Sequence, residues 1–322
     1  MPKSRDELVA HARNTIARGS KSFAAASMLF DRVTRERVWL LYAWCRAADD
    51  LADAQDMGGE LGDQSDAAER LATIRTRTAL ALSGVETGDA SFDGLAVVAG
   101  ECGLTQDMCD DVIAGFALDA DDWRPRSESD MLQYCYHVAG AVGVMMAKVM
   151  GVPDEDADTL DRACDLGIAF QLANIMRDLW EDDAAGRCYL PVEWLVEADI
   201  APGQHMKPMY RAELVAMVHD ACLMARAYEA SARIGAARLP LRCRWAILSA
   251  TGIYGSIARK VEKAGVHGWD HRVFTSRFEK LGHVFGAGAA SLRAPPASCG
   301  QEAEARPLTR RDFEERARKA AR

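Results

Sequence analysis

Most of the chain consists of long segments in which apolar residues recur every three or four positions. That spacing gives an α-helix one apolar face. Short stretches rich in glycine, proline and polar residues separate these segments. No stretch of useful length alternates apolar and polar residues as a half-buried strand would. The pattern predicts an all-α fold, a single-domain helical bundle around a central cavity.

Capping residues set the limits of the predicted helices. Ser4 with Glu7 forms a capping box ahead of the first helix, and Ser127 with Asp130 caps a later one. Glycines inside that later helix permit close helix approach or a kink, each at a cost of roughly 1 kcal/mol. The predicted helices span residues 4–18, 32–53, 67–82, 92–101, 105–118, 130–150, 155–183, 208–234, 241–262 and 274–292.

The composition changes at residue 294. Pro295 and Pro296 interrupt the helical pattern, and residues 306–322 carry seven basic side chains against three acidic ones. We expect residues 1–293 to form the helical domain and residues 294–322 to form a polar, basic, flexible tail. Because a basic and partly amphipathic tail can meet an anionic lipid surface, the sequence leaves peripheral membrane contact open.

Charge and cysteine content narrow the class of protein. The 322 residues carry a net charge of −9, which argues against general nucleic-acid binding. Nine cysteines, without CxxC spacing, indicate reduced thiols. The first residues are charged and lack an apolar signal core, and no run of 18 apolar residues occurs. We therefore expect a cytoplasmic location.

The predicted helix at residues 155–183 carries a row of oxygen-bearing side chains. Asn174, Asp178 and Asp182 are four residues apart and share one helix face, and Gln171 lies one turn earlier. The positions between them are mostly apolar, and burying an uncompensated carboxylate costs several kcal/mol. Hard oxygen ligands of this kind suit Mg²⁺. Arg177 adds a permanent cation suited to phosphate.

The predicted helix at residues 32–53 repeats this arrangement. Asp49 and Asp53 are four residues apart, with Arg46 one turn before Asp49 and Tyr42 one turn before Arg46. One such acidic pair is usually a solvated helix face, but two pairs in apolar helices, each with an arginine, favour a site. Two helices of this kind facing each other would hold metal ions that bridge to a diphosphate.

Two further polar stretches allow more than one interpretation. Ser20, Lys21 and Ser22 stand at a helix start, where hydroxyls, backbone N–H groups and an ammonium can bind an anion or simply cap the helix. Residues 119–122 form a third acidic cluster. Its position at the end of a predicted helix favours a solvated loop over a minor role in the site.

Taken together, these motifs resemble those of the squalene/phytoene synthase family, the head-to-head prenyl-diphosphate synthases. Besides the two DxxxD motifs, residues 20–23, 134–140 and 186–191 carry the resemblance, which runs in order from about residue 20 to about residue 272. It implies an isoprenoid-synthase fold. It also implies condensation of two geranylgeranyl diphosphates to phytoene through a cyclopropylcarbinyl diphosphate, in carotenoid biosynthesis, with release of diphosphate and no requirement for NADPH.

The resemblance also implies roles for individual residues. Mg²⁺, with Mn²⁺ as a substitute, would be held by Asp49, Asp53, Asn174, Asp178 and Asp182. The four aspartates of this set and Arg177 would be the catalytic residues. Substrate contacts are expected from Ser20, Lys21, Ser22, Tyr42, Arg46, Tyr136, Gln171, Arg177, Tyr254 and Arg272. In this set the Tyr136 ring is a candidate to stabilise a carbocation, and Arg272 lies about one residue out of the family's register.

Three other classes fit parts of the sequence. The spacing of Asn174, Asp178 and Asp182 also resembles the metal triad of terpene cyclases, although the serine-lysine-serine and tyrosine-rich stretches argue against that class. A non-catalytic helical assembly factor would be expected to have lost acidic or basic site residues. A di-iron carboxylate bundle needs Glu-x-x-His pairs, and no histidine of the sequence has a glutamate three residues before it.

Overall fold

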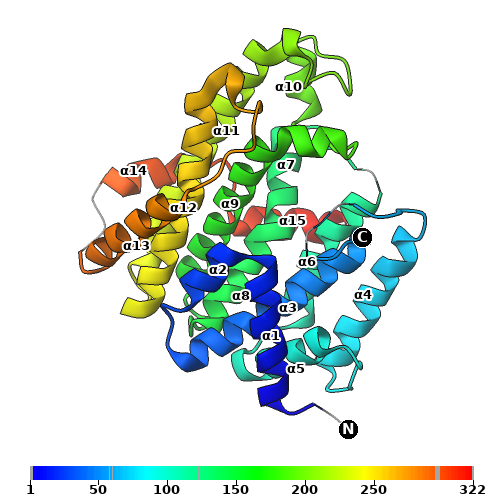
Figure 1. Cartoon of the computed structure of the whole chain (residues 1–322), viewed down its shortest axis with the longest axis vertical. Coiled ribbons are helices and arrows are strands. Elements are labelled where there is room, and N and C mark those ends of the chain that lie inside the picture. The colour runs from blue at the N-terminus through cyan, green and yellow to red at the C-terminus, as the bar shows by residue number, and fades with distance from the viewer. Residues whose placement is uncertain (1–2, 58, 60, 122, 294–297, 321–322) are drawn as a thin grey trace. The chain divides into compact units, whose positions relative to one another are not determined.

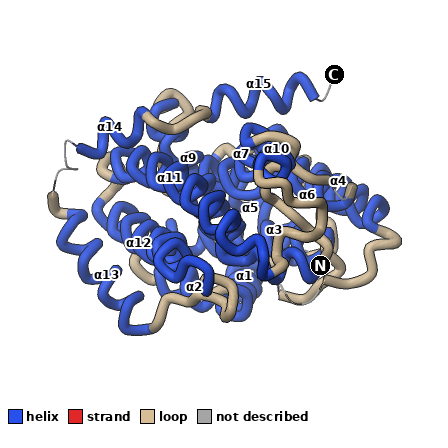
Figure 2. The backbone as a smooth tube through the Cα atoms, turned by 90° about the horizontal axis from the view of Figure 1, so that it is seen from above, coloured by secondary structure: helices blue, strands red, loops and turns tan. Residues whose placement is uncertain are grey.

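The computed structural model describes residues 3–57, 59, 61–121, 123–293 and 298–320. The chain divides into two compact units, Met1–Asp121 with Val144–Asp156, and Asp122–Gly143 with Ala157–Arg322 (Figure 1). All regular structure in the described residues is helical, which confirms the predicted all-α class (Figure 2). None of these helices is both long and apolar enough to cross a membrane.

The first unit is organised around α3, which packs against α1, α4, α5 and α6. Asp31 opens α3 by accepting a hydrogen bond from the Thr34 N–H at 3.0 Å. Leu40, Leu41 and Trp44 on its inner face are fully buried. The helices are α1 (Arg5–Gly19), α2 (Lys21–Ser27), α3 (Arg32–Ala52), α4 (Ala67–Leu82), α5 (Ala90–Cys102) and α6 (Gln106–Ala120). The unit also contains most of α8 (Ala141–Val149).

The second unit is organised around α9, which packs against α7, α11, α12, α15 and the π-helical turn η1. Figure 1 shows α9 and α11 side by side along much of their length. The longer helices are α9 (Ala157–Ala184), α11 (Arg211–Ala236), α12 (Leu241–Ala264) and α13 (Arg277–Ser291). The shorter elements are α7 (Glu128–Cys135), η1 (Tyr136–Gly140), α10 (Val192–Glu197), η2 (Pro208–Tyr210), η3 (Gly265–His267), α14 (Ser298–Glu304) and α15 (Arg310–Ala320).

Glycines let η1 and the start of α8 approach α9 closely, one of the two roles the sequence suggested for them. A Cβ on Gly167 would lie 2.1 Å from the Ala139 carbonyl oxygen, and one on Gly143 would lie 2.3 Å from that of Ala163. No side chain fits at either position. The predicted helix at residues 130–150 is accordingly two helices joined by the π-helical turn η1.

The C-terminal segment, residues 298–320, packs within the second unit. The prediction of a flexible tail is therefore wrong for these residues. Phe313 is fully buried and its ring stacks on Tyr136 with 5.3 Å between centroids. Arg310 pairs with Asp161 on α9 at 2.6 Å, and Arg306 pairs with the buried Asp165. Arg306, Arg310 and Arg316 therefore have acidic partners far away in the sequence. The domain boundary at residue 294 stays a prediction.

Candidate active site

The first acidic motif lies at the C-terminal end of α3. Asp49 and Asp50 are in its last turn and Asp53 is its C-cap, and no basic residue occupies that turn. The carbonyl end of a helix carries partial negative charge, so carboxylates there are destabilised unless a cation is near. The chain leaves α3 through Ala54 and Met57, both with positive φ. Non-glycine residues of that kind concentrate at functional sites.

Arg46 is the protein's own cation at this motif. Its Nη1 lies 2.7 Å from Asp49 Oδ2 and 3.5 Å from Asp50 Oδ1. Burial raises the pKa of Asp49 to about 6; Arg46 opposes that shift, and the charges of Asp53, Asp50 and Asp119 add to it. Because the Asp49 side chain is still 37% exposed, a metal ion from solvent can reach it. One arginine therefore leaves this cluster short of positive charge.

Tyr42 connects Arg46 to the segment at the start of α2. Its ring packs against Phe23 at 5.6 Å, and its hydroxyl is near enough to Arg46 to raise the pKa of that guanidinium. A Cβ on Gly19 would lie 2.5 Å from the Tyr42 hydroxyl, so a larger residue there would displace that hydroxyl. The Ser20 hydroxyl accepts a hydrogen bond from the Phe23 N–H and caps α2. The capping interpretation thus holds for Ser20, and anion binding by Ser20, Lys21 and Ser22 stays a prediction.

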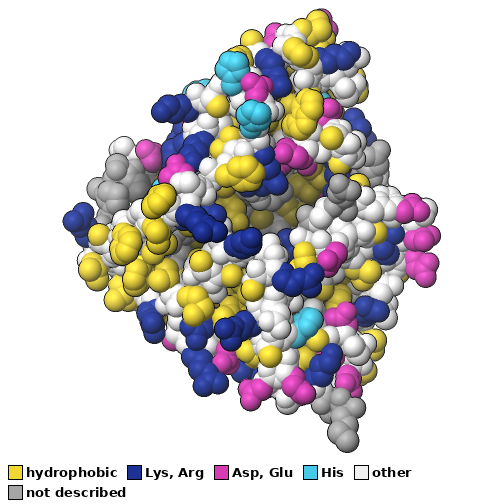
Figure 3. Space-filling model, in the orientation of Figure 1, with side chains coloured by type: hydrophobic (Ala, Val, Ile, Leu, Met, Phe, Trp, Pro, Cys, Tyr) yellow, Lys and Arg dark blue, Asp and Glu magenta, His cyan; other side chains and the backbone are white. Residues whose placement is uncertain are grey.

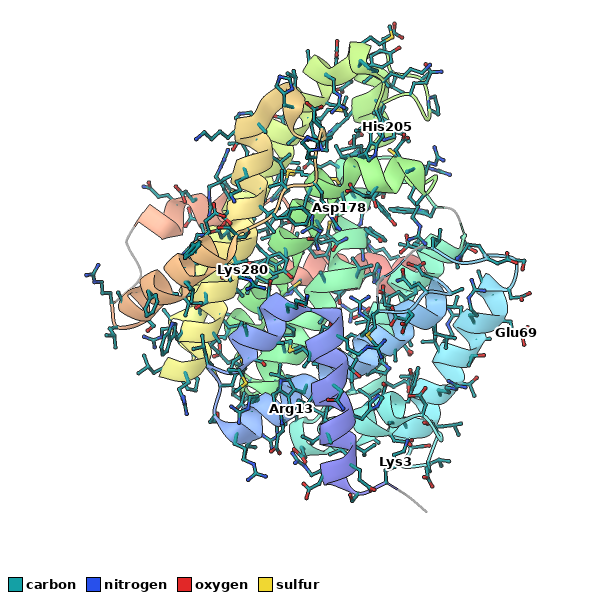
Figure 4. The ribbon with its side chains drawn as sticks, viewed as in Figure 1. Lys3, Arg13, Glu69, Asp178, His205 and Lys280 are labelled. Carbon is teal, nitrogen blue, oxygen red and sulfur yellow. The ribbon has the colours of Figure 1, made fainter. Side chains whose placement is uncertain are left out.

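The second acidic motif lies on α9 in a different electrostatic setting (Figure 4). Arg177 Nε donates to Asp178 Oδ1 at 2.6 Å, with a second bond from Nη2 to Oδ2, and Arg272 Nε donates to Oδ1 at 2.9 Å. Burial acts to raise the pKa of Asp178, but the hydrogen bonds from Arg177 and Arg272 outweigh it and lower the pKa below its ordinary value. Arg272 thus lies beside the second acidic motif, and its predicted contact with a diphosphate stays a prediction.

A pocket of about 490 Å³ opens beside these two arginines. Arg211 adds a third guanidinium, which lies 5.5 Å from the centre of the Trp269 ring. Trp269 Nε1 donates to the Met176 carbonyl on α9 at 2.8 Å and so holds the pocket wall in place. Three arginines around one opening are suited to a polyanion such as a diphosphate. The pocket is lined by Arg177, Trp180, Glu181, Arg211, Trp269, Asp270, His271 and Arg272.

The other predicted residues of the second unit divide into two groups. Asn174 Nδ2 donates to Gln171 Oε1 at 3.4 Å on α9, and the Tyr254 ring stacks on Phe170 at 4.2 Å within electrostatic reach of Arg177. Asp182 lies one turn beyond Asp178 on the same helix. Tyr136, by contrast, is buried with one ring face stacked on Phe313, and its predicted contact with a carbocation stays a prediction.

The carboxylates at the end of α3 fit a divalent cation. They are hard oxygen donors, they lie at the negative end of a helix, and the neighbouring carboxylates Asp50, Asp53 and Asp119 add to the rise that burial causes in the pKa of Asp49. Across the part of the chain that the structure describes, no three His, Cys, Asp or Glu side chains already surround a metal position. Asp178 is bonded to two arginines, so it would have to exchange a partner to ligate an ion.

Sequence reasoning missed several contributors. Asp119, at the end of α6, is near enough to raise the pKa of Asp49, although the sequence favours a solvated loop for its cluster. Gln55 Nε2 donates to Asp49 Oδ2 at 3.3 Å from the turn after α3. Arg211 and Trp269 reach the pocket from distant segments. Only Asp119 had a sequence signal, an acidic cluster at the end of a helix.

The fold and the two arginine-paired acidic motifs define a helical protein of the isoprenoid-synthase class. The chain belongs to the squalene/phytoene synthase family, whose pattern matches residues 16–279. It is 45% identical over 293 residues to a phytoene synthase of Pseudescherichia vulneris, covering 90% of this chain and 94% of that one. It is 42% identical to a 15-cis-phytoene synthase of Pantoea ananas, over 88% of this chain and 92% of that one.

Solved structures agree on the fold. A ligand-bound dehydrosqualene synthase superposes with a TM-score of 0.78 at 26% identity, covering 89% of this chain and 97% of that one. A squalene synthase from Alicyclobacillus acidocaldarius gives a TM-score of 0.71 at 21% identity. Members of this family act on prenyl diphosphates and generally depend on divalent metal ions.

Proposed function

We infer that the protein joins two molecules of geranylgeranyl diphosphate head to head to form phytoene in carotenoid biosynthesis. The observation that carries this inference is the pair of arginine-bearing acidic motifs, in a chain 45% identical over most of its length to a phytoene synthase. Each motif combines carboxylates for metal ions with guanidinium groups for phosphate oxygens. A prenyl diphosphate presents those oxygens, and its hydrocarbon tail needs an apolar environment.

The reaction proceeds through two ionisations. Cleavage of the C1–O bond in one substrate releases diphosphate and leaves an allylic cation, which the double bond of the second substrate attacks. Loss of a proton closes a cyclopropylcarbinyl diphosphate. A second C–O cleavage, rearrangement and loss of another proton give phytoene and the second diphosphate. An apolar cavity would protect each cation from water.

The chain's own contribution is to bind and neutralise the leaving groups. We propose that Arg177, Arg272 and Arg211 hold a diphosphate at the α9 pocket and that Arg46, Lys21 and the hydroxyls of Ser20 and Ser22 serve the α3 motif. Tyr42, Gln171 and Tyr254 would position these groups. Mg²⁺, held by Asp49, Asp53, Asn174, Asp178 and Asp182, would supply Lewis-acid stabilisation of the departing diphosphate.

The Asp178 contacts suggest how binding and metal loading are linked. In the ligand-free chain Arg177 and Arg272 both donate to Asp178. A diphosphate offers these guanidiniums a more highly charged partner. Moving them onto the substrate would free the carboxylate oxygens for a metal ion. Diphosphate and metal are therefore expected to bind cooperatively at α9.

A product assay tests the proposed function. Purified protein receives geranylgeranyl diphosphate, Mg²⁺ and detergent without NADPH, and the extract is examined by mass spectrometry. Phytoene whose formation stops on adding EDTA is the expected result. A thirty-carbon hydrocarbon from farnesyl diphosphate, with no product from geranylgeranyl diphosphate, would contradict the substrate. No product from either would contradict the reaction. The cytoplasmic location stays a prediction.

A further inference from the structure

Helix α13 presents an apolar face to solvent. Phe278 is 87% exposed, Phe285 is 72% exposed and Leu292, just past the helix end, is 75% exposed. Leu281 lies between the two phenylalanines in the sequence. Successive spacings of three, four and seven residues place these four side chains on one side of the helix. Figure 3 shows hydrophobic side chains gathered over α13. Exposed aromatic residues in such a series indicate a contact surface.

The opposite face of α13 is firmly attached to α12. Trp245 Nε1 donates to the Val284 carbonyl at 2.7 Å, and Arg244 Nη1 donates to the Ser291 carbonyl at 3.0 Å. Ala287 is buried between them. A capping box of Ser276 with Glu279 fixes the start of the helix. The outward direction of the apolar residues is therefore set by packing, and does not result from a loosely attached helix.

The charges at the ends of this face are basic. Arg277 and Arg293 are exposed there. The single acidic residue of α13, Glu279, is paired with Lys260 at 2.7 Å. The chain as a whole carries a net charge of −9. A local basic rim on an acidic protein is selective for an anionic partner.

We propose that α13 is a membrane-docking helix that inserts Phe278, Leu281, Phe285 and Leu292 into the boundary region of an anionic phospholipid surface. Aromatic and aliphatic side chains on one face with arginine at the edges are the features of an interfacial amphipathic helix. The basic C-terminal segment is less suited to this role, because Phe313 points into the protein and Arg306, Arg310 and Arg316 have acidic partners. The proposal goes beyond the catalytic function and does not depend on it.

Vesicle flotation tests this proposal without substrate. The double variant Phe278→Glu/Phe285→Glu is compared with Val196→Glu/Met209→Glu, which changes two residues that are 69% and 73% exposed outside α13. The vesicles are phosphatidylcholine, alone or with about a third phosphatidylglycerol. We expect wild type and control to float with the anionic vesicles, and the α13 variant to bind roughly tenfold to a hundredfold more weakly.

Three further measurements complete the test. Replacing Arg277 and Arg293 by glutamine should weaken binding to anionic vesicles by about fivefold per arginine, and added salt should act in the same direction. Turnover of detergent-dispersed substrate should stay at the wild-type level in the α13 variant, which separates docking from folding and catalysis. Equal flotation of wild type and α13 variant would overturn the proposal. So would a wild-type dimer in light scattering that the variant abolishes, since the face would then belong to a second copy.

Discussion

The acidic motifs on α3 and α9 have the same spacing and opposite electrostatic conditions. At the end of α3, one arginine meets several carboxylates and a negative helix terminus, and the pKa of Asp49 rises to about 6. On α9, Asp178 accepts hydrogen bonds from two arginines, and its pKa falls below the ordinary value. The first motif has one arginine for several carboxylates, whereas at the second two arginines bond one carboxylate beside a pocket lined by three arginines and two acidic residues. We therefore propose primary cation binding at α3 and primary diphosphate binding at α9.

Loss of either carboxylate should have the largest effect. Asp49→Ala and Asp178→Ala are each expected to lower kcat/KM by at least about a thousandfold, because each removes charge stabilisation from the leaving group. Asp107→Ala, an exposed aspartate on α6, is the matched control and should retain full activity. Circular dichroism should show intact helicity in all three proteins. Full turnover in either site variant would contradict the assignment of both motifs to catalysis.

The C-terminal segment packs against α9 within the second unit. Truncating the buried Phe313 to alanine should lower the free energy of unfolding by about 3–5 kcal/mol, since it leaves a cavity between α15 and η1. Urea denaturation measures the loss. Phe274→Ala, at a phenylalanine that is 70% exposed, should change stability by less than about 0.5 kcal/mol. Similar values for both variants would mean that the segment is not packed.

Removing Arg272 should weaken diphosphate binding at α9 without weakening metal binding at α3. In Arg272→Gln, calorimetric titration with inorganic diphosphate should show affinity lower by about tenfold, because one charge-assisted contact is lost. Mn²⁺ affinity without diphosphate should not fall, since the change removes one of the two arginines that donate to Asp178 Oδ1 and removes no carboxylate. Arg13→Gln removes an exposed arginine on α1 and should match wild type. A parallel loss of metal affinity in Arg272→Gln would contradict the division of roles.

The pH dependence of metal binding should differ between the motifs. A metal ion binds the ionised carboxylate, and the pKa of Asp49 is raised to about 6. Its carboxyl is therefore mostly ionised at pH 7 and mostly protonated at pH 5, so Mn²⁺ affinity at α3 should fall about tenfold over that interval. Asp178 stays ionised over the same range because its pKa is lowered. Asp49→Asn should remove most of the pH dependence; an unchanged profile would exclude Asp49 as its source.

Most of the helices could be predicted from local sequence patterns. Nine of the ten predicted helices differ from the observed limits by at most three residues at either end, the tenth, residues 130–150, is divided by η1, and both expected capping boxes are present. Helix periodicity and caps depend on neighbours within four residues, which a sequence displays directly. The same holds for the Arg46–Asp49 contact, whose partners are one turn apart on α3.

Contacts between distant segments could not be read in the same way. Arg306 meets Asp165 across 141 positions, and Arg272 meets Asp178 across 94. A basic tail looks solvated in a sequence because its partners are on another helix. The stacking of Phe313 on Tyr136 likewise joins residues far apart in the sequence. The facing arrangement of the two acidic helices also stays a prediction.

The most direct test of the division between α3 and α9 is a Mn²⁺ titration followed by electron paramagnetic resonance, without substrate. We predict that wild type binds the ion, that Asp49→Asn/Asp53→Asn loses this binding, and that Asp178→Asn retains it. Adding inorganic diphosphate should then create further Mn²⁺ binding in wild type but not in Asp178→Asn. The reverse pattern, with binding lost in Asp178→Asn and kept in the α3 double variant, would contradict the account.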